Sequence, residues 1–564
     1  MLLSGPMATA GGTWLRSAGL GGLLLGVFGC GDGHLTAILP ASAIPAPADE
    51  CQAGEDHGAG PLPPMGWNGW NSFGCSAELD QAKFHAEIDA LVDTGLRDVG
   101  YEYVNLDDCW QTGRAADGNL AVSTARFPDG IAALAQYAHR AALKLGIYAS
   151  VNGCARPELI TPGSRGYEEQ DAAAFASLGV DYIKYNSCGG SGVEASVRAM
   201  RAAVDATGRP MFLSVSEAPF KYWHTQVGQS WRIHADIQPS WQAILDIIDT
   251  TTSLAAYAGQ GGYNDSDMLW IGNPALSEGE SRAYFSAWAI LASPLLAGND
   301  LTTMSEATRS ILSQRDVIAL NQDALRLQGA LLATQGDVMV FAKPLAQCAA
   351  RGVVLLNRGE QAAEGSVAWS DLGLVAGPAL VRDLWTGQES TQTDRVKVSV
   401  GPHEAVALRL VGTEAPLPRG NVYLSDLSWT YATNGWGPVE RDLEVGDKAA
   451  GDGAPLSMGG HGYAKGLGTN SPSLVRFRLG KRCRELSADI GIDDSSGGAG
   501  SAVFQVWADG DKLFDSGVLE GGQPPMPIRV DVTGRSELRL WVGEVDDFGL
   551  DHADWADAQL RCDD

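Results

Sequence analysis

The stretch DYIKYNSCGG, residues 181–190, predicts a short buried β-strand that runs into a glycine-rich bend. Aromatic and β-branched residues favour a strand, whereas successive glycines favour a bend. Asn186 stands at the end of this strand, in surroundings that indicate an active site where a carboxylate would be expected. The fold class depends on what the rest of the chain places around this strand end.

Short apolar runs of this kind alternate with helical patterns from Met65 onward. The segments 78–96 and 129–143 carry apolar residues at helical spacing. Such alternation over roughly 250 residues predicts a (β/α)8 barrel or a doubly wound parallel sheet. The strand-like runs are YEYVNLDD, KLGIYAS, VDYIKYN, MFLSVS, SWRIHAD and SPLLAG.

Polar residues at the predicted strand ends decide between these two folds. In a barrel the C-terminal ends of all strands converge on one mouth, where catalytic groups gather. A doubly wound sheet typically shows a phosphate-binding glycine fingerprint after its first strand, and none occurs in this sequence. We therefore predict an α/β fold, a (β/α)8 TIM barrel over residues 62–325. The strand-end residues are Asp107, Asp108, Asn186, Glu217, Asp236, Asp265 and Asp267.

The pattern changes after about residue 325 to runs of period two, such as DVMVFAKPL and RVKVSVGPHEAVALRLVG. Short strands with turn signals predict an antiparallel β-domain over 326–415. A linker, TEAPLPRG, precedes a second all-β segment over 419–564, which we expect to be a β-sandwich. Cys483 and Cys562 lie one near each end of this last module, where a disulfide would staple it.

The N-terminus predicts an export signal over residues 1–30, followed by a linker rich in Ala, Pro and Gly over 31–61. Arg16 precedes an apolar run that ends at Cys30 and is too short for a stable membrane span. Lipoprotein processing with a lipid anchor at Cys30 and ordinary signal cleavage both stay open. We expect an extracellular, periplasmic or surface-anchored protein in which disulfides are permitted.

Charge and length limit the function classes. The net charge of −28, from 68 acidic and 40 basic residues, disfavours binding to nucleic acid or to anionic membranes. A chain of 564 residues is too long for one ordinary core, so two to four domains are expected. The 16 Trp residues suit sugar stacking or β-sandwich cores, and core packing accounts for most of them.

Several ordered motifs resemble the melibiase-type α-galactosidases of glycoside hydrolase family 27. They are PPMGWNGWNSFGC, NLDDCW, LGIYA, DYIKYNSC, WRIHADI, GGYNDSDMLWIGN and NQDALRLQG, spread over roughly residues 62–415. The resemblance implies a (β/α)8 barrel followed by an antiparallel β-domain. It also implies a retaining exo-hydrolase of terminal α-D-galactose or α-N-acetylgalactosamine, with no metal and no organic cofactor.

The same resemblance implies a sugar pocket. Trp67 would stack on the apolar face of a pyranose, and Asp107 and Asp108 would accept hydrogen bonds from its 4- and 6-hydroxyls. Lys184 and Arg232 would contact hydroxyls and steady the carboxylates. An Asp-Asp pair in an arbitrary sequence is more often a solvated turn, but this pair ends an apolar strand. Tyr148 and Asp267 complete the expected substrate-binding set.

Position two of the sugar is expected to meet Glu217 and Phe220. Both match residues that galactosidases carry there, whereas the N-acetylgalactosaminidases have small residues at both places, so galactose is favoured. Ala218 departs from the usual Trp, which predicts a looser pocket edge.

Two carboxyl groups are needed for retaining hydrolysis, one as nucleophile and one as acid/base. Asp236 matches the family acid/base, and Asn186 stands at the nucleophile position, where the family has Asp. A neutral amide cannot form the glycosyl ester, and losing such a group commonly costs several kcal/mol of transition-state stabilisation. Ser150 is a second departure, since relatives usually carry Asp there.

Three interpretations of Asn186 stay open. The chain is a weak or altered hydrolase, in which Glu217 or another carboxylate activates a water. Alternatively, it is a galactose-binding protein without catalysis, or Asn186 reflects a sequence error, an engineered change or deamidation. A buried Asn at a strand end often only satisfies backbone groups. A surface adhesin that binds only through its last module is a further alternative.

By resemblance, Cys75 pairs with Cys109 and Cys154 with Cys188 at the barrel mouth. Cys51 and Cys348 are left without an assigned partner. A zinc site is the rival interpretation of the cysteines, but no Cys-x-x-Cys occurs and export favours disulfides.

The segment from Asn421 onward resembles NPCBM carbohydrate-binding modules, which implies binding to galactose-containing glycans. Asn470 stands where relatives often have His, so their sugar contacts are not carried over. Partners would be α-galactoside oligosaccharides or galactose-containing glycans. An acidic group suggests either a Ca²⁺ or glycan site or ordinary solvated loops, namely Asp493, Asp494, Asp546, Asp547, His552 and Asp554.

Overall fold

The computed structural model describes residues 60–156, 159–259, 261–545 and 550–564. The predicted signal over 1–30, nearly all of the linker over 31–61, and Cys30 and Cys51 lie outside the described residues. Asp546 and Asp547 lie outside them as well.

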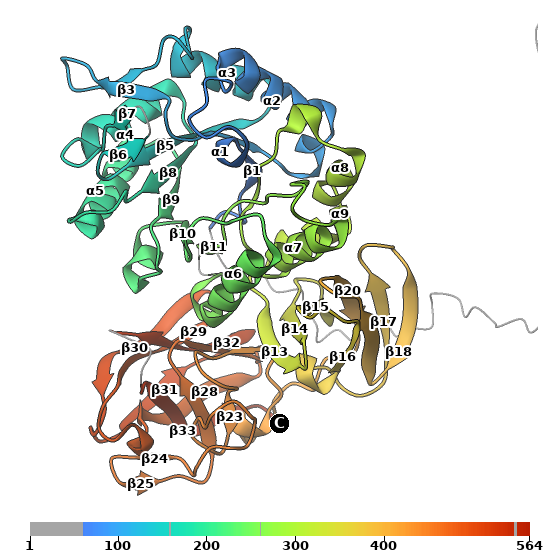
Figure 1. Ribbon diagram of the computed structural model, residues 1–564. Coiled ribbons are helices and arrows are strands. Elements are labelled where there is room, and N and C mark those ends of the chain that lie inside the picture. Colours follow the sequence, from blue (N-terminus) through green and yellow to red (C-terminus); the bar gives the residue numbers. More distant parts are fainter. Residues whose placement is uncertain (1–59, 157–158, 260, 546–549) are drawn as a thin grey trace, which may run out of the picture. The chain divides into compact units, whose positions relative to one another are not determined.

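Eight parallel strands form one sheet in the order β11-β10-β9-β8-β5-β2-β1-β12. The sheet closes on itself, because Leu269, just after β11, pairs in parallel with Ala297 of β12. The predicted (β/α)8 barrel is confirmed (Figure 1). Its strands are β1 (Met65–Asn68), β2 (Tyr103–Leu106), β5 (Lys144–Ser150), β8 (Tyr182–Asn186), β9 (Phe212–Ser216), β10 (Ser230–Arg232), β11 (Tyr263–Asp265) and β12 (Leu295–Ala297).

Amphipathic helices alternate with these strands and cover the outside of the sheet (Figure 1). Polar side chains cap the starts of two of these helices. Asp80 accepts from the Lys83 N–H at the start of α2, and Ser277 and Glu280 form a capping box at the start of α7. The helices are α1 (Trp70–Phe73), α2 (Gln81–Asp93), α3 (Gly130–Arg140), α4 (Glu168–Leu178), α5 (Val193–Ala206), α6 (Trp241–Ser253), α7 (Glu278–Ile290), α8 (Glu306–Leu312) and α9 (Arg315–Asn321).

Side-chain alternation along each strand sorts residues between the barrel interior and the helix layer. Tyr103, Tyr182 and Phe212 pack together near the N-terminal ends of their strands, with ring centroids 5.1 to 6.3 Å apart. Counting in steps of two from Tyr103 and Tyr182 reaches Asp107 and Asn186 at the opposite end. The aromatic cluster therefore fills one end of the barrel, and polar side chains lie at the other.

One interior glycine is fixed by this packing. A Cβ atom on Gly146 of β5 would lie 1.9 Å from Oδ1 of Asn105 on β2. Glycine is therefore the only residue that lets these two neighbouring strands keep Asn105 in the interior.

Two inserted hairpins lie beyond the barrel strands. The first pairs β3 (Gln111–Arg114) with β4 (Leu120–Val122), and the second pairs β6 (Cys154–Arg156) with β7 (Leu159–Thr161). Both follow strands whose ends carry predicted site residues, so they shape the mouth of the barrel.

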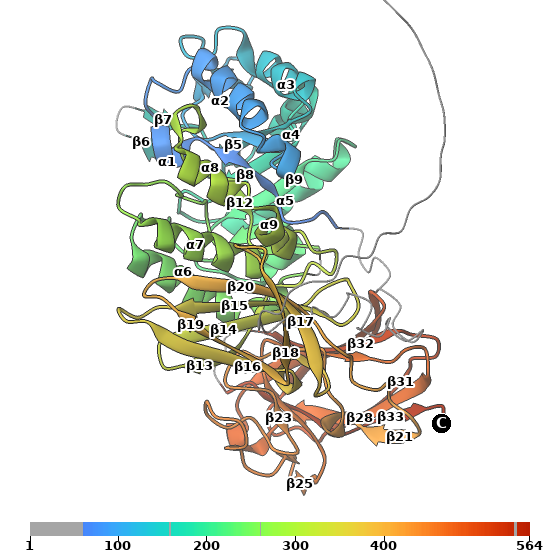
Figure 2. The same ribbon diagram turned by 90° about the vertical axis from the view of Figure 1, so that its right-hand side faces the viewer.

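The next segment is the expected antiparallel β-domain. Helix α7 packs against its strands β15 and β20 (Figure 2). Its main sheet has the order β13-β14-β15-β20-β17-β18, and β16 pairs with β19. The strands are β13 (Ala330–Gln335), β14 (Val338–Pro344), β15 (Ala350–Asn357), β16 (Ala363–Ala368), β17 (Pro378–Asp383), β18 (Glu389–Thr393), β19 (Arg395–Val400) and β20 (Ala405–Val411).

Two antiparallel sheets make up the last segment, as predicted for a β-sandwich. Trp555 and Phe504 lie in its core at a centroid distance of 5.2 Å. One sheet has the order β23-β26-β33-β28-β31, with β21 also on β33, and the other has the order β22-β27-β32-β29-β30. The strands are β21 (Asn421–Tyr423), β22 (Tyr431–Thr433), β23 (Glu440–Arg441), β24 (Ser457–Met458), β25 (His461–Gly462), β26 (Gly466–Asn470), β27 (Ser473–Arg478), β28 (Cys483–Ile492), β29 (Ser501–Ala508), β30 (Asp511–Glu520), β31 (Met526–Asp531), β32 (Glu537–Glu544) and β33 (His552–Cys562).

The three predicted disulfides are confirmed. Cys75 is bonded to Cys109, Cys154 to Cys188 and Cys483 to Cys562. The last of these joins the neighbouring strands β28 and β33. Cys348 is disulfide-bonded as well.

Candidate functional site

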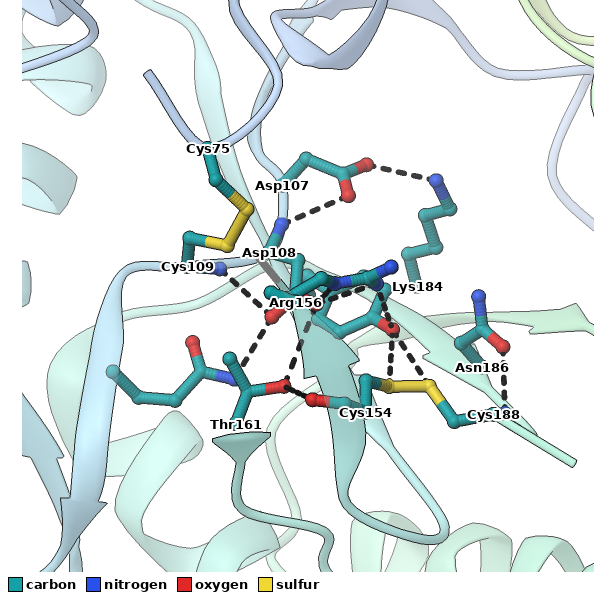
Figure 3. A network of polar contacts seen from close by, with 12 residues as sticks. Cys75, Asp107, Asp108, Cys109, Cys154, Arg156, Thr161, Lys184, Asn186 and Cys188 are labelled. Atoms are coloured by element: carbon teal, nitrogen blue, oxygen red, sulfur yellow. Dashed lines mark hydrogen bonds and ion pairs between the residues drawn. A yellow bond between two sulfur atoms is a disulfide. The ribbon is translucent and has the colours of Figure 1, made fainter. Parts of the chain in front are cut away.

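Asp107 follows β2 and is held by three hydrogen bonds, and Figure 3 shows those with Lys184 and Asp108. Lys184 Nζ and Asn68 Nδ2 each donate to its Oδ2 at 2.8 Å, and the Asp108 N–H donates to Oδ1 at 2.8 Å. Burial alone would raise the pKa of Asp107, but the charge and hydrogen bond of Lys184 and the two other donors outweigh it and lower the pKa. Asp107 is therefore a buried carboxylate at neutral pH.

Asp108 points to a different set of partners. Arg156 Nε donates to its Oδ2 at 2.6 Å, and the Cys109 N–H donates to its Oδ1 at 2.7 Å (Figure 3). Burial raises the pKa of Asp108 above its ordinary value despite Arg156. The two adjacent carboxylates thus belong to two separate ion pairs, one with Lys184 and one with Arg156.

Arg156 is a mouth residue that sequence reasoning missed. It ends β6, and its guanidinium lies 4.9 Å from the ring centroid of Trp70, a half-buried indole on α1. Its position after a strand of the barrel could not be recognised, because the short hairpin that carries it has no helical or strand periodicity of its own.

Trp67 does not line the mouth, and the prediction that its indole stacks on a sugar is wrong. Its side chain is 0% exposed and packs edge-on against Phe73 and Phe84. On β1, Asn68 points into the barrel toward Asp107, so the preceding residue must point outward to the helix layer. Trp70 is the indole that is accessible at this strand end.

Tyr148 is buried beside the Cys154–Cys188 disulfide. Its hydroxyl lies 3.1 Å from the sulfur of Cys154 and 3.2 Å from that of Cys188, and Arg156 Nη2 donates to it at 3.3 Å. Burial, with the nearby charges of Asp108 and Asp107, raises the pKa of Tyr148 far above its ordinary value. Tyr148 therefore stays neutral and acts as a hydrogen-bonding group.

Asn186 is half-buried at the end of β8. The Cys188 N–H donates to Oδ1 of Asn186 at 2.9 Å, which fixes the amide with Nδ2 on the other side (Figure 3). An amide nitrogen carries only donors, so the group that Asn186 turns away from Cys188 is a hydrogen-bond donor and not a nucleophile.

The position opposite Asn186 is neutral as well. Ser150 of β5 pairs in register with Asn186, and its side chain is 0% exposed. Its Oγ has no hydrogen-bond partner among the described residues. Asn186 and Ser150, both expected to depart from the family residues, are thus neighbours on adjacent strands.

Arg232 at the end of β10 joins two carboxylates. Its Nη1 donates to Asp236 Oδ1 and its Nη2 to Asp267 Oδ1, each at 2.8 Å. Arg232, Asp265 and Asp267 are buried. Burial raises the pKa of Asp265, and the negative charge of Asp267 adds to this.

Asp236 differs from these carboxylates because its side chain is 76% exposed. Partial desolvation raises its pKa, but the charges of Arg232 and Lys184 and the hydrogen bond from Arg232 outweigh this and lower the pKa, and Arg156 contributes in the same direction. Lys184 and Arg156 extend from β8 and β6, so Asp236 faces the same mouth as they do.

Glu217 lies after β9 in contact with its own loop. Lys221 Nζ donates to its Oε1 at 2.8 Å, and His224 Nε2 lies 3.5 Å from its Oε2. Burial raises the pKa of Glu217, but His224 and Lys221 outweigh it and lower the pKa. Sequence reasoning missed both loop partners. Phe220, from the same loop, packs on Tyr257 at a centroid distance of 4.9 Å.

Three residues at the strand ends adopt left-handed backbone conformations without being glycine. They are Cys109, Cys188 and Asp267, with φ values of 69°, 47° and 72°. Strained positions of this kind gather at functional sites, and here two of the three are disulfide-bonded.

The acidic residues of the last segment cap loops within the described chain. Asp493 accepts from the Ser457 and Ser495 N–H groups, and Asp494 from those of Gly459 and Gly460. Asp554 is fully buried, and burial together with Asp493 raises its pKa well above the ordinary value.

Two further features of this segment bear on ligands. The His552 ring lies 3.3 Å from a carboxylate oxygen of Glu444, and the Asn470 side chain donates to the Ser471 carbonyl. Both side chains therefore already have a partner within this segment.

No group of three or more His, Cys, Asp or Glu side chains suited to a metal ion occurs in residues 60–156, 159–259, 261–545 and 550–564. Over the same residues, none of the helices has the length and apolar character that crossing a membrane requires.

Family models match three parts of the chain. Residues 62–323 match a model described as alpha galactosidase A, and residues 335–410 match the alpha galactosidase C-terminal beta sandwich domain. Residues 420–561 match the NPCBM/NEW2 domain.

Curated and solved proteins agree with these matches. An alpha-galactosidase from Cyamopsis tetragonoloba is 42% identical over 347 residues, which are 60% of this chain and 82% of that protein. Alpha-galactosidase A from Cellvibrio japonicus is 38% identical over 62% of this chain and 91% of its own length. The crystal structure of alpha-galactosidase I from Mortierella vinacea has a TM-score of 0.60 and 31% identity, covering 64% of this chain and 100% of that one. By sequence and by fold, the chain belongs to the α-galactosidase family of glycoside hydrolases.

Proposed function

We propose that the protein releases terminal α-D-galactose from galactosides at the barrel mouth, at a rate lowered by Asn186. The observation that supports this most strongly is the set of ion pairs at the barrel mouth, Asp107 with Lys184 and Asp236 with Arg232. Charged groups that are already oriented bind sugar hydroxyls without further rearrangement, and reject a sugar whose hydroxyl points elsewhere.

Each residue then has a distinct role. Asp107 and Asp108 accept hydrogen bonds from the sugar, and Lys184 donates to it while neutralising Asp107. Asp236 is the acid/base, and its exposure leaves room for the leaving group and for water. Trp70 takes over the stacking role that Trp67 cannot play, because its indole is accessible.

Position two of the sugar is assigned to Glu217 and Phe220. Lys221 and His224 hold Glu217 in place, so that it accepts from the 2-hydroxyl as a fixed carboxylate. Phe220 closes this side of the pocket against an acetamido group. This supports galactose over N-acetylgalactosamine. Tyr148 and Asp267 position Arg156 and Arg232, which they contact.

The reaction itself is impaired at Asn186. The amide oxygen is occupied by the Cys188 N–H and the nitrogen has no lone pair to offer, so no glycosyl ester can form. Removing a catalytic nucleophile lowers a rate by about 10³-fold or more. A non-catalytic galactose-binding protein is the second candidate, and the fixed, neutral amide of Asn186 is the observation that favours it.

The test is hydrolysis of p-nitrophenyl α-D-galactoside by the unchanged protein and by Asn186→Asp. We expect slow release by the unchanged protein and a rate at least about 10³-fold higher in the variant. Release only by the variant would identify the unchanged protein as a galactose-binding protein. If neither protein released p-nitrophenol or bound galactose, the proposal would be wrong.

We also propose that the protein is exported and that its last segment, over 419–564, binds galactose-containing glycans. The three disulfides support an oxidising compartment. A lipid anchor at Cys30 is proposed with it, and fractionation of cells that carry Cys30→Ala tests the anchor. The barrel would span 62–325 and the antiparallel β-domain 326–415.

A further inference from the structure

Asp236 and Asn186 are two polar side chains at the mouth that solvent can reach. Asp107, Asp265 and Asp267 are buried, and Glu217 is held by Lys221. Of the strand-end carboxylates Asp107, Asp108, Glu217, Asp236, Asp265 and Asp267, Asp236 is the one that is mainly exposed. Asn186 is half-buried and turns its Nδ2 away from Cys188 (Figure 3).

These two groups suit a reaction other than hydrolysis. Hydrolysis of an α-galactoside needs a protonated acid and a nucleophile, whereas the mouth offers a carboxylate paired with Arg232 and an amide donor. A carboxylate is a general base. An N–H donor cannot attack carbon, but it stabilises an anion that leaves from the same side.

Lys184 adds a positive charge to the part of the mouth that Asn186 occupies. It lies two residues before Asn186 on β8, so both side chains project from the same face of the strand. Its side chain is 15% exposed, and its Nζ lies 2.8 Å from Oδ2 of Asp107. An anion that departs toward Asn186 therefore meets one N–H donor and one nearby ammonium group.

We propose that the site also transfers a galactosyl unit from a β-configured donor with a small anionic leaving group to a hydroxyl acceptor, and so makes an α-galactoside. This rests on the proposed function, because the same residues must recognise galactose. The step uses Asp236 and Asn186 in the roles that their contacts permit.

The atoms balance without any further reactant. The bond from C1 to the leaving group breaks on the β face, and its electron pair departs with the anion toward Asn186. The acceptor oxygen attacks C1 from the α face, and Asp236 takes the proton from that hydroxyl. The new C1–O bond is α, so the configuration is inverted, and the net by-product is the protonated leaving group.

The product persists because of the same side chain. An α-galactoside formed at the mouth is the substrate of the hydrolytic reaction, which Asn186 impairs. In the Asn186→Asp variant, the new carboxylate would repel the departing anion and would hydrolyse the product. Transfer and efficient hydrolysis are thus alternatives set by one side chain.

The experiment supplies β-D-galactosyl fluoride as donor and p-nitrophenyl β-D-xyloside as acceptor to the full-length protein. A fluoride electrode measures donor consumption, and mass spectrometry with proton NMR identifies the disaccharide and its linkage. We expect saturable fluoride release above the uncatalysed rate and an α-linked galactosyl xyloside that accumulates.

Three variants give the controls. Asp236→Asn should lower transfer at least tenfold, because no base then takes the acceptor proton. Asn186→Asp should accumulate no disaccharide and should hydrolyse p-nitrophenyl α-D-galactoside. Asn421→Asp makes the same charge change at an exposed position of β21 and should leave transfer within twofold.

The outcomes separate the two proposals. Transfer is refuted if Asn186→Asp hydrolyses the α-galactoside while the unchanged protein releases no fluoride above the blank. A β-linked product, or transfer that survives Asp236→Asn, refutes it equally. If Asn186→Asp is inactive and neither protein binds galactose, the proposed function fails and transfer falls with it.

Discussion

Two sets of residues at the barrel mouth differ in charge. The charged set consists of three ion pairs, Asp107 with Lys184, Asp108 with Arg156, and Asp236 with Arg232. The neutral set is Ser150 and Asn186, which are neighbours in register on β5 and β8, between β2 and β10 in the sheet. In the proposed function, recognition of the sugar depends on the charged set and attack on its anomeric carbon depends on position 186, so that one can be kept while the other is lost.

The largest effect should come from introducing a negative charge into the neutral set. Asn186→Asp is expected to raise kcat/KM for p-nitrophenyl α-D-galactoside by about 10³-fold or more, because a carboxylate can form the glycosyl ester. Ser150→Asp makes the same change on the adjacent strand and should change kcat/KM by less than about tenfold, since it adds no nucleophile at Asn186. Equal gains in kcat/KM from both variants would mean that the two neutral positions are equivalent.

A smaller but still large effect should come from breaking one ion pair of the charged set. Lys184→Met leaves the buried carboxylate of Asp107 without its counter-ion, which typically costs about 3–5 kcal/mol. We expect a lower midpoint of urea unfolding and, by calorimetry, loss of the galactose-binding site in the barrel. Lys512→Met, at an exposed pair with Asp515, is the control and should change neither quantity appreciably. A stable Lys184→Met protein that still binds galactose would contradict the role of this pair.

The pH dependence of hydrolysis tests whether the charged set and the neutral set interact. Asp236 must be protonated to act as the acid in hydrolysis, and Arg232 holds its pKa below the ordinary value. Hydrolysis by the unchanged protein should therefore fall as pH rises through the acidic range. In Asn186→Asp the added negative charge raises the pKa of Asp236, so the falling limb of the kcat profile should move to higher pH. A limb that stays in place or moves to lower pH would show that the two residues do not sense each other.

The smallest effect is expected at Ser150 itself. Its buried Oγ has no hydrogen-bond partner among the described residues, so Ser150→Ala removes no bond there. Unfolding free energy should change by less than about 0.5 kcal/mol, or rise slightly, because a buried polar atom without a partner is unfavourable. A loss of about 2 kcal/mol or more in thermal or urea unfolding would reveal a polar interaction of Ser150.

The sequence predicts the strand ends of the barrel better than the residues between them. Asp107, Asn186, Arg232 and Asp236 follow apolar runs, and a parallel barrel must bring such positions to one mouth. The prediction for Trp67 is wrong because motif spacing does not show which way a strand residue points. That direction became evident only from Asn68, which bonds to Asp107 inside the barrel.

The sequence does not reveal the site residues on inserted loops, for a different reason. Arg156, Lys221 and His224 reach their carboxylate partners through backbone paths that no periodicity describes. Trp70 is equally hidden, since it lies three residues after Trp67 in the same motif. Contacts across 48 residues, such as Arg156 with Asp108, are fixed by tertiary packing, and by the Cys154–Cys188 disulfide that anchors the hairpin.

We propose that the charged set at the mouth recognises galactose although Asn186 stands at the nucleophile position. Titration calorimetry of the unchanged protein with D-galactose and with D-glucose, its 4-epimer, tests this most directly, with Asp107→Asn separating the barrel from the last segment. We predict saturable galactose binding that is at least tenfold tighter than glucose binding, and the loss of one binding site per molecule in Asp107→Asn, so that only binding by the last segment remains. Equal affinity for the two sugars, or a binding stoichiometry that Asp107→Asn leaves unchanged, would mean that the barrel mouth does not recognise galactose.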